Sequence, residues 1–510
     1  MKTKELVITF LCAFLVAWVI QHFILDRWFG VSPVTQVVSQ ECRALHKEVE
    51  FLDMQTTKQQ ARTVIQVPWG TVTFTTEGAA IDELSFKQLV NDGNLVLNTI
   101  TPSESLAKER RNFLVALQSL TPWYYELTSH TDAQDHVAIV YQAHNDECSI
   151  RKLFRVYKDR YVIDMDLFIT PRGDHTIEPR VLFNAPHMAQ GRDKGSGQTV
   201  DVVSAVVDSM GAFKKIAVAN VGAEQCWQAP SLIGADSRYF VHALVRDEQH
   251  FVSRGYCSAE TNGTLTVILE GHPVKQDTRY TLSFYCGPKE IESMAAVDTR
   301  LDQTLEYSGI LAPISKLLIK LLKLLYTLLG NYGFAIIVLT ILVKLLLLPF
   351  TFKSDASMRQ QAEVQKKLAY LQQRYKDDPD KLNHERTELI RKHGMPGLGG
   401  CLPLLLQLPL FIALSRVLYS SIELYKAPML WIPDLSASDP YYILPIGVTL
   451  SMLMQAATVD AKQRLSVIAM ALVFGALTVN FASGLALYIF VSTLLTVVQT
   501  SALRYLNIVK

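Results

Sequence analysis

A lysine lies inside a long apolar run, and its chemistry is the most informative in this sequence. The run covers residues 332–352 and contains Lys344. Such a run is long enough to cross a bilayer, since a span needs about 20 apolar residues at ~1.5 Å rise each. A cation near the bilayer centre costs roughly 2.5 kcal/mol or more. Lys353 marks the expected polar edge, ~13 Å away, which is further than a lysine comfortably reaches by snorkelling. The sequence therefore favours a hydrated functional cation over a snorkelling one.

Few other polar side chains lie within the predicted spans, and they are Thr340, Gln407, Gln455, Tyr488, Ser492 and Thr493. In lipid, such groups are more stable next to one another or to water than next to acyl chains. We expect several of them to line one hydrated concavity together with Lys344. No acidic residue lies at the depth of Lys344 in any predicted span. Lys344 is therefore expected to be available to a ligand rather than held in a structural ion pair.

Other reactive residues form no pattern typical of catalysis or metal binding. The histidines are scattered, and five of the seven cysteines fall on the predicted exported side: Cys42, Cys148, Cys226, Cys257 and Cys286. Their number is odd and their spacing fits no metal site, so both disulfides and buried thiols remain open. Residues 191–197, GRDKGSG, lack the spacing of a nucleotide-binding loop. We expect no cofactor, no metal, no ATP use and no enzymatic activity.

The composition indicates a membrane protein with more than one domain. The chain has 510 residues, of which 49% are hydrophobic and 19% charged. It is too apolar to be wholly soluble. Its 49 basic and 48 acidic residues nearly balance, so no global field draws it to nucleic acid.

The N-terminal residues 1–27 are predicted to be a retained transmembrane anchor, with a cleaved signal peptide as the alternative. Lys2 and Lys4 precede an apolar run at residues 6–25. The run is longer than a usual signal-peptide core and lacks a convincing cleavage site. The preceding positive charge places the N-terminus in the cytoplasm.

Residues 28–309 are predicted to be a large all-β domain on the far side of the membrane, most simply a sandwich. Short alternating segments predict strands at residues 71–75, 137–141, 161–169, 264–269 and 280–284. Asp164 and Asp166 alternate along one of these strands, which predicts surface positions. A tethered enzyme that uses this domain is one alternative function.

The remaining chain is predicted to be helical. Residues 310–329 carry Lys316, Lys320 and Lys323 on one face, which predicts an amphipathic helix in the outer interface; a buried helix of the β domain is the alternative. Residues 330–352 form the first core span. Residues 353–400 contain ten lysines or arginines and predict a cytoplasmic helical hairpin, whose second arm begins at Pro379. Residues 401–506 supply four more spans, one of them short at residues 465–479, and residues 507–510 form a cytoplasmic tail.

Four ordered segments of the helical region resemble the YidC/Oxa family of membrane protein insertases, in the Gram-negative form with a large periplasmic domain. The segments are residues 332–344 (YGFAIIVLTILVK), 396–411 (PGLGGCLPLLLQLPLF), 430–442 (LWIPDLSASDPYY) and 483–488 (SGLALY). The resemblance covers about residues 310–506. At the position of Lys344 the family usually carries arginine.

The resemblance implies a protein of the bacterial inner membrane, with both termini cytoplasmic and the β domain periplasmic. It implies a five-helix core around a groove open to the cytoplasm and to lipid. The candidate groove residues are Lys344, Thr340, Gln407, Tyr488 and Ser492. The implied function is insertion and chaperoning of nascent membrane proteins, alone or with the Sec translocon, in contact with lipids and with the ribosome at the hairpin. The family's periplasmic domain resembles sugar-binding sandwiches, so the alternative enzyme would be a membrane-tethered periplasmic enzyme that acts on carbohydrates. A small-solute transporter that uses Lys344 as an anion site is the other alternative.

Overall fold

The computed structural model has two compact units, which we describe separately. It describes residues 50–52, 60–90, 93–100, 111–187, 203–221, 224–259, 264–305, 311–375, 379–393, 402–456 and 461–505. The β unit lies within Phe14–Ser308, and the helical unit lies within Gly309–Tyr419 and Glu423–Lys510. The predicted anchor, Cys42, the loop at residues 191–197 and the tail at 507–510 lie outside the described residues.

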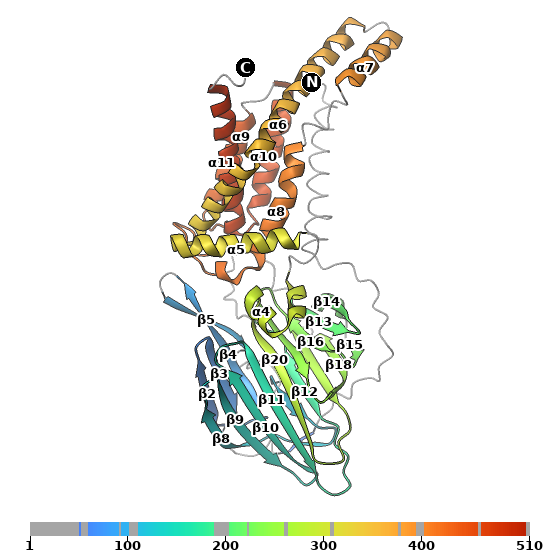
Figure 1. Ribbon diagram of the computed structural model, residues 1–510, viewed down its shortest axis with the longest axis vertical. Coiled ribbons are helices and arrows are strands. Elements are labelled where there is room, and N and C mark those ends of the chain that lie inside the picture. Colours follow the sequence, from blue (N-terminus) through green and yellow to red (C-terminus); the bar gives the residue numbers. More distant parts are fainter. Residues whose placement is uncertain are drawn as a thin grey trace. The chain divides into compact units, whose positions relative to one another are not determined.

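The β unit is built on a nine-stranded antiparallel sheet (Figure 1). Its strands, in spatial order, are β14 (Ala212–Ala217), β13 (Ser204–Ser209), β16 (Leu232–Asp236), β17 (Phe240–Asp247), β20 (Thr278–Pro288), β11 (Val162–Pro171), β10 (Cys148–Tyr157), β9 (His136–His144) and β8 (Glu126–Asp132). Three of these strands, β9, β11 and β20, fall at positions predicted from period-two alternation.

Two smaller sheets complete the unit. One contains β15 (Gln225–Gln228), β18 (Val252–Ala259), β19 (Leu265–Gly271), β12 (Arg180–Asn184) and β6 (Leu114–Ala116). The other contains β2 (Arg62–Val67), β3 (Gly70–Thr75), β4 (Ala80–Val90) and β5 (Gly93–Ile100). A short parallel pair joins β1 (Glu50–Leu52) to β7 (Leu120–Pro122).

Both smaller sheets pack on the same face of the large sheet, which makes the unit a sandwich. Phe154 of β10 lies with its ring centroid 4.9 Å from that of Phe74 on β3. Phe284 of β20 lies 4.8 Å from Phe113 and 5.5 Å from Phe183 of β12. All five rings are buried. Each contributes on the order of 2 kcal/mol of burial free energy.

A buried lysine joins the two smaller sheets. Lys152 of β10 is fully buried, and its Nζ donates to the carbonyl oxygens of Gly78 at 2.8 Å, Ala79 at 3.0 Å and Phe113 at 2.8 Å. These three acceptors have left-handed backbone conformations. Burial lowers the pKa of Lys152 well below its ordinary value. The ammonium group therefore replaces water for turn carbonyls that no strand satisfies.

The opposite face of the large sheet carries a charged network, and the prediction that Asp164 and Asp166 are surface residues was wrong. They are 8% and 0% exposed. Arg155 donates to both oxygens of Asp166, at 2.9 and 3.0 Å, and Arg279 donates at 2.7 Å. Burial alone would raise the pKa of Asp166, but the hydrogen bonds from Arg155 and Thr281 and the nearby charges lower it overall. The long arginine side chains cover the carboxylates.

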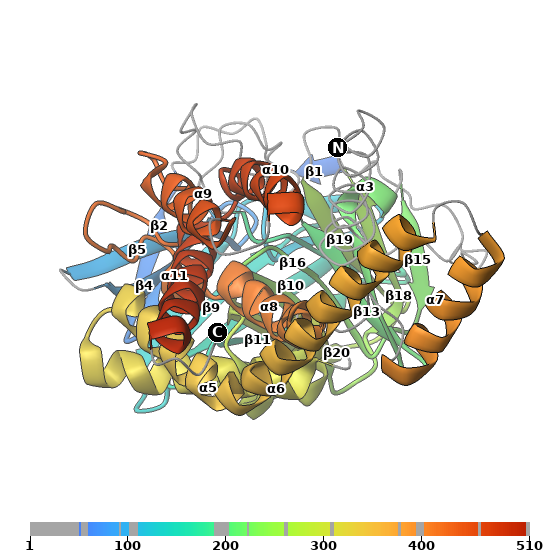
Figure 2. The same cartoon turned by 90° about the horizontal axis from the view of Figure 1, so that it is seen from above.

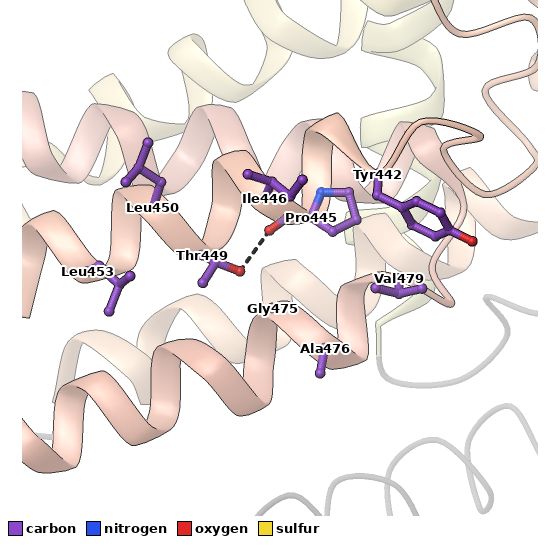
Figure 3. A pocket seen from close by; sticks show the side chains of 9 residues that line it. All are labelled: Tyr442, Pro445, Ile446, Thr449, Leu450, Leu453, Gly475, Ala476 and Val479. Carbon is purple, nitrogen blue, oxygen red and sulfur yellow. Dashed lines mark hydrogen bonds between the residues drawn. The ribbon is translucent and has the colours of Figure 1, made fainter.

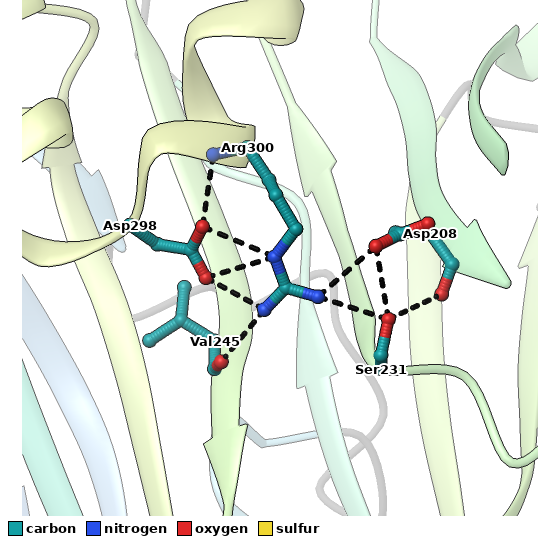
Figure 4. A network of polar contacts seen from close by, with 5 residues as sticks. All are labelled: Asp208, Ser231, Val245, Asp298 and Arg300. Carbon is teal, nitrogen blue, oxygen red and sulfur yellow. Dashed lines mark hydrogen bonds and ion pairs between the residues drawn. The ribbon is translucent and has the colours of Figure 1, made fainter. Parts of the chain in front are cut away.

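A short helical segment ends the β unit and is fixed to the sheet by one arginine (Figure 4). It comprises α4 (Ile291–Val297) and the 3₁₀ helix η3 (Thr299–Thr304), while α3 (Val218–Val221) lies earlier in the chain. Arg300 donates to Asp298 at 2.6 Å, to Asp208 at 3.0 Å and to the carbonyl of Val245 at 3.1 Å. Asp298 caps η3 and also accepts from the backbone N–H of Arg300. The guanidinium thus links η3 to β13 and β17.

The cysteines adopt both of the states left open by the sequence. Cys226 is disulfide-bonded, whereas Cys148, Cys257 and Cys286 are buried free thiols. Burial raises the pKa of the Cys148 thiol to about 11, so this thiol is unreactive near neutral pH.

The helical unit contains seven α-helices in the described part of the chain (Figure 1). They are α5 (Ala312–Leu329), α6 (Tyr332–Arg374), α7 (Pro379–His393), α8 (Leu402–Ser420), α9 (Ile443–Ala456), α10 (Ala461–Thr478) and α11 (Ser483–Tyr505), with the 3₁₀ turn η4 (Ile422–Leu424) after α8. Helix α9 contacts both α10 and α11, and the view from above shows the three next to one another (Figure 2). The core of the helical unit includes Leu339 of α6, Leu444 of α9 and Tyr488 of α11.

Helix α5 lies across the other helices (Figure 1) and has three distinct faces. One face, with Leu318, Leu322 and Leu325, is buried against the core. The lysines occupy a second face, where Lys323 Nζ lies 2.9 Å from Glu423 Oε1. A third face is apolar and exposed: Ile314, Leu317, Leu324 and Leu328. The amphipathic helix predicted from the sequence is therefore present, packed on the helical unit rather than on the β unit.

Helix α6 is longer than the predicted span. Gly330, with φ 68°, ends α5, and Asn331 begins α6 by accepting hydrogen bonds from the N–H groups of Gly333 and Phe334. The helix then continues past Pro349 and Lys353 to Arg374, roughly 65 Å in all. The first arm of the charged hairpin is thus a continuation of the span. The second arm, α7, begins at Pro379 as predicted.

Candidate functional site

Lys344 lies on α6 and reaches α11. Its half-buried side chain donates from Nζ to Thr496 Oγ1 at 3.0 Å. The hydroxyl of Thr496 in turn donates to the carbonyl of Ser492 at 2.9 Å. A lysine ammonium has three donors, and this chain of hydrogen bonds uses one of them. The geometry leaves the cation with further donor capacity inside the apolar unit.

Lys344 has no carboxylate partner among the residues that the structure describes. A hydroxyl satisfies one donor without neutralising the charge, so the site keeps a net positive charge. Such a cation is stable only with water or a polar ligand beside it.

The candidate groove residues divide into several environments. Ser492 joins Lys344 through Thr496, and it is 2% exposed. Thr340 lies one turn before Lys344, but it is 1% exposed and its hydroxyl donates to the carbonyl of Ile336 in the same helix. Tyr488 is buried in the helical core, with its ring 6.5 Å from that of Phe411. Gln407 lies in α8, and its side chain is outside the described part of the structure.

A second polar cluster lies between α9 and α11. Ser451 Oγ lies 3.2 Å from Thr493 Oγ1, and Gln455 Nε2 donates to the Thr493 carbonyl at 3.4 Å. Helix α11 therefore presents polar groups to α6 through Thr496 and to α9 through Thr493. The sequence predicted that several of these side chains would line one hydrated concavity with Lys344. The described hydrogen bonds instead form two separate clusters, and the shared concavity stays a prediction.

Sequence reasoning missed Thr496 and Arg416. Lys344 and Thr496 lie at nearly the same distance from the first residues of their helices, Tyr332 and Ser483, so matching depths would have found the pair. Arg416 is a second cation in an apolar helix, half-buried in α8. Each lies within a largely apolar helix, so neither belongs to a pattern that draws attention in the sequence.

The chemistry available at Lys344 is electrostatic and hydrogen-bonding. Within the described ranges, no group of histidine, cysteine or acidic residues could hold a metal ion. Lysine and threonine can bind carboxylates and backbone carbonyls in a medium that excludes bulk water, where such interactions are stronger.

The outer surface of the helical unit is apolar. Leu346 of α6 is 74% exposed and Ile446 of α9 is 63% exposed. In the part of the chain that the structure describes, two helices are long and apolar enough to cross a membrane, at Tyr332–Pro349 and Ser483–Ala502. Three shorter apolar helices accompany them there: Pro409–Ser420, Ile443–Ala456 and Val467–Thr478. Fold and site together define a helical membrane protein with a cationic group inside its bundle and a large β-sandwich domain.

Comparison with known proteins identifies the family. Residues 62–321 match the family profile described as "YidC periplasmic domain", and residues 324–508 match "60Kd inner membrane protein". The membrane protein insertase YidC of Citrifermentans bemidjiense is 31% identical over 69% of this chain and 67% of its own length. The YidC of Anaeromyxobacter dehalogenans strain 2CP-C is 31% identical over 72% of this chain and 69% of its own length. A crystal structure of an active YidC insertase covers 95% of this chain and 98% of its own, with a TM-score of 0.36 and 17% identity.

The chain belongs to the YidC family of membrane protein insertases. Membership places it among inner-membrane proteins with a helical membrane core and a periplasmic β-sandwich domain.

Proposed function

We propose that this protein inserts nascent membrane proteins through a hydrated, cationic groove beside Lys344. The observation that carries the proposal is a lysine inside an apolar helix whose Nζ contacts a hydroxyl and no described carboxylate. A cation in that position costs free energy, which a visiting polar segment offsets. The names of the relatives support the insertase activity.

The proposed mechanism has no covalent step. The polar, often acidic, leading segment of a nascent chain enters the groove, where Lys344 and Thr496 replace part of its hydration. Gln407, Thr340, Tyr488 and Ser492 belong to the proposed groove wall, and the last three are buried in this state. The apolar segment of the client then moves sideways into lipid, and its transfer free energy drives the step.

The short core helices assist this movement. The span predicted to be short, residues 465–479, corresponds to the apolar part of α10, Val467–Thr478, which is shorter than a hydrocarbon core of ~30 Å. A bilayer that thins around short helices lowers the barrier for a polar segment. In the same proposal, α5 lies in the outer interface, the hairpin of α6 and α7 faces the cytoplasm and the ribosome, and the Sec translocon and lipids are partners.

Charge variants of Lys344 test the proposal in cells depleted of the native protein. We expect Lys344→Arg to keep insertion of all clients, because it keeps the charge. We expect Lys344→Glu to impair clients with acidic translocated segments by at least about tenfold, since attraction becomes repulsion at short range in a medium of low dielectric. Insertion is measured by protease protection of each client.

A matched pair of clients supplies the control. The two differ only in whether their translocated segment carries acidic residues or the corresponding amides. If Lys344→Glu inserts both clients as well as the parent protein does, the charge has no role in the mechanism. A lost solute flux with normal insertion would instead favour a transporter.

A further inference from the structure

A polar pocket lies on the outer face of the nine-stranded sheet, opposite the face that packs against the smaller sheets. Its volume is about 390 Å³. Strands β9, β10, β11 and β20, which are neighbours in the sheet (Figure 1), form its floor. Gln142, Arg151, Phe168 and Arg279 occupy paired positions on these four strands and make a row across the pocket.

Arg151 is oriented but has no ion-pair partner in the described part of the chain. Its guanidinium carbon lies 4.0 Å from the ring centroid of Phe168. Stacking on an aromatic ring holds a guanidinium in place by cation–π attraction. The planar group then presents its N–H donors in a fixed fork, which matches a carboxylate.

Arg279 pairs with Phe168 in the sheet and lies near the same ring. Its guanidinium carbon lies 5.2 Å from the Phe168 centroid, and its Nη2 donates to Asp166 at 2.7 Å. Below the pocket, the charges of Arg155 and Arg279 balance those of Asp164 and Asp166. Arg151 lies outside this network, so none of these four residues balances its charge, and Asp277 is the one carboxylate of the pocket lining.

The rim of the pocket selects among anions. Asp277 is exposed at the rim and has no partner within the described ranges. A second carboxylate disfavours a doubly charged phosphate more than a singly charged carboxylate. The same group can accept hydrogen bonds from backbone N–H donors. Ser149 and Thr170, the next register pair, add neutral hydroxyls.

We propose that this pocket binds acidic segments of extended polypeptides. A side-chain carboxylate of the segment binds the fork of Arg151, with Arg279 beside it, while backbone N–H groups of the segment donate to Asp277. In an extended chain, alternate side chains point the same way every ~7 Å, so one segment can place carboxylates on the arginine row. The proposal does not depend on the role of Lys344.

The test measures peptide binding to the full-length protein in nanodiscs of zwitterionic lipid. The probes are two fluorescein-labelled octapeptides, one alternating glutamate and serine and the other alternating glutamine and serine. By fluorescence anisotropy, we expect the glutamate peptide to bind at least about tenfold more tightly, since bonds to charged groups are roughly twice as strong as neutral ones. We expect Arg151→Gln to remove most of this difference in affinity. We expect Arg151→Glu to bind a third octapeptide, alternating lysine and serine, more tightly than the glutamate peptide.

Three variants complete the design. Arg246→Gln is the matched control, because Arg246 is an exposed arginine of β17 in the same sheet but does not line the pocket. Arg246→Gln should bind like the parent protein, and Lys344→Gln shows how much of the peptide binding belongs to the proposed groove. Phe168→Leu keeps an apolar side chain under Arg151 but removes the aromatic face, and it should weaken binding of the glutamate peptide.

The proposal is overturned if the two octapeptides bind equally to the parent protein, or if Arg151→Gln and Arg246→Gln lose affinity equally. It is also overturned if inorganic phosphate or vesicles with anionic lipid displace the glutamate peptide from the Arg151 site while binding more tightly, because the site would then recognise phosphate groups. Loss of binding in Lys344→Gln would assign the peptide to the helical unit.

Discussion

Buried charges in the β unit are compensated in two ways. Asp236 is fully buried between two ammonium groups, with Lys215 Nζ at 2.9 Å and Lys289 Nζ at 2.6 Å. Lys152 donates to three backbone carbonyls, and its Nζ lies 5.3 Å from the ring centroid of Tyr125 and 5.7 Å from that of Phe154. The first arrangement offsets the carboxylate charge with opposite charges, whereas the second satisfies the donors of Lys152 without an opposite charge.

Replacing Lys152 with methionine tests the second arrangement. Lys152→Met keeps the length and apolar stem but leaves three buried carbonyls without a donor. We expect the free energy of unfolding of the β unit to fall by about 3 kcal/mol, because each unsatisfied buried acceptor costs ~1 kcal/mol or more. Chemical denaturation measures it. The control, Lys158→Met, removes a contact to exposed Asp132 and should change stability by less than about 0.5 kcal/mol. Equal or greater stability of Lys152→Met would show that ammonium desolvation outweighs the hydrogen bonds.

His242 makes the stability of the β unit depend on pH. It is 1% exposed, its Nδ1 donates to the Asn184 carbonyl at 3.3 Å, and Thr99 Oγ1 lies 3.4 Å from its Nε2. Burial lowers its pKa to about 4. The unfolded chain therefore binds a proton below pH ~6.5 that the folded chain does not, so stability is complete above that pH and falls toward pH 4.

The expected loss between pH 6.5 and pH 4 is on the order of 3 kcal/mol for this residue. Urea denaturation of the parent protein and of His242→Gln across this range measures it. The carboxylates that titrate in this range contribute equally to both curves, so the difference between the two curves reports the protonation of His242. Parallel curves would show that His242 has the same pKa in the folded and unfolded states.

Some of these residues could be identified from the sequence and others could not. Lys344 stands out because an apolar run surrounds it. Asp166 was misassigned because alternation along a strand shows which face a residue occupies, not what covers that face. The Asp166 carboxylate is covered by Arg155, on the neighbouring strand, and by Arg279, which is distant in the sequence. Thr496 was missed because its partner lies on a different helix.

Close packing of α9 on α10 depends on a glycine (Figure 3). A Cβ on Gly475 would overlap Thr449 Oγ1. The Thr449 hydroxyl is fixed by donating to the Pro445 carbonyl at 2.8 Å. Beside this crossing lies an apolar groove of about 380 Å³, lined by Ile446 and Leu450 among others. The glycine lets the two helices approach, which small residues commonly allow in membranes.

Adding one methyl group at this crossing should destabilise the helical unit. We expect Gly475→Ala to cost about 1–3 kcal/mol through overpacking, seen as a lower unfolding temperature in detergent. Thr449→Ala in the same chain should restore part of the loss. Ala476→Leu is the control, since Ala476 is exposed and lines the groove. Equal losses in Gly475→Ala and Ala476→Leu would argue against a tight crossing.

The elements themselves were largely predictable, and their associations were not. Period-two alternation located the five predicted strands, because local side-chain alternation reflects burial of one face. The packing of both smaller sheets on one face is a long-range result that no local pattern specifies. Helix α6 continues past Lys353 because polarity changes there while helix propensity does not, so hydropathy marks a membrane edge rather than a helix end.

The whole molecule divides its tasks between two units with separate cores. Aromatic side chains such as Phe154 and Phe284 form one core, and Leu339, Leu444 and Tyr488 belong to the other. Lys344, Thr496 and both polar clusters lie in the helical unit. The Arg151 pocket and the buried charges lie in the β unit. The proposed insertion step therefore requires no side chain of the β unit.

Deleting residues 60–305 tests this division. We expect the shortened chain to keep most of the insertion activity, because every proposed groove residue and the bundle core remain. Complementation of depleted cells and protease protection of a small client measure it. Glutamate-peptide binding should be lost, since Arg151 is removed. The matched control carries Lys344→Glu in the shortened chain and should fail with acidic clients. A shortened chain that reaches normal membrane levels but inserts no client would place an essential step in the β unit and favour an activity of that domain over the groove mechanism.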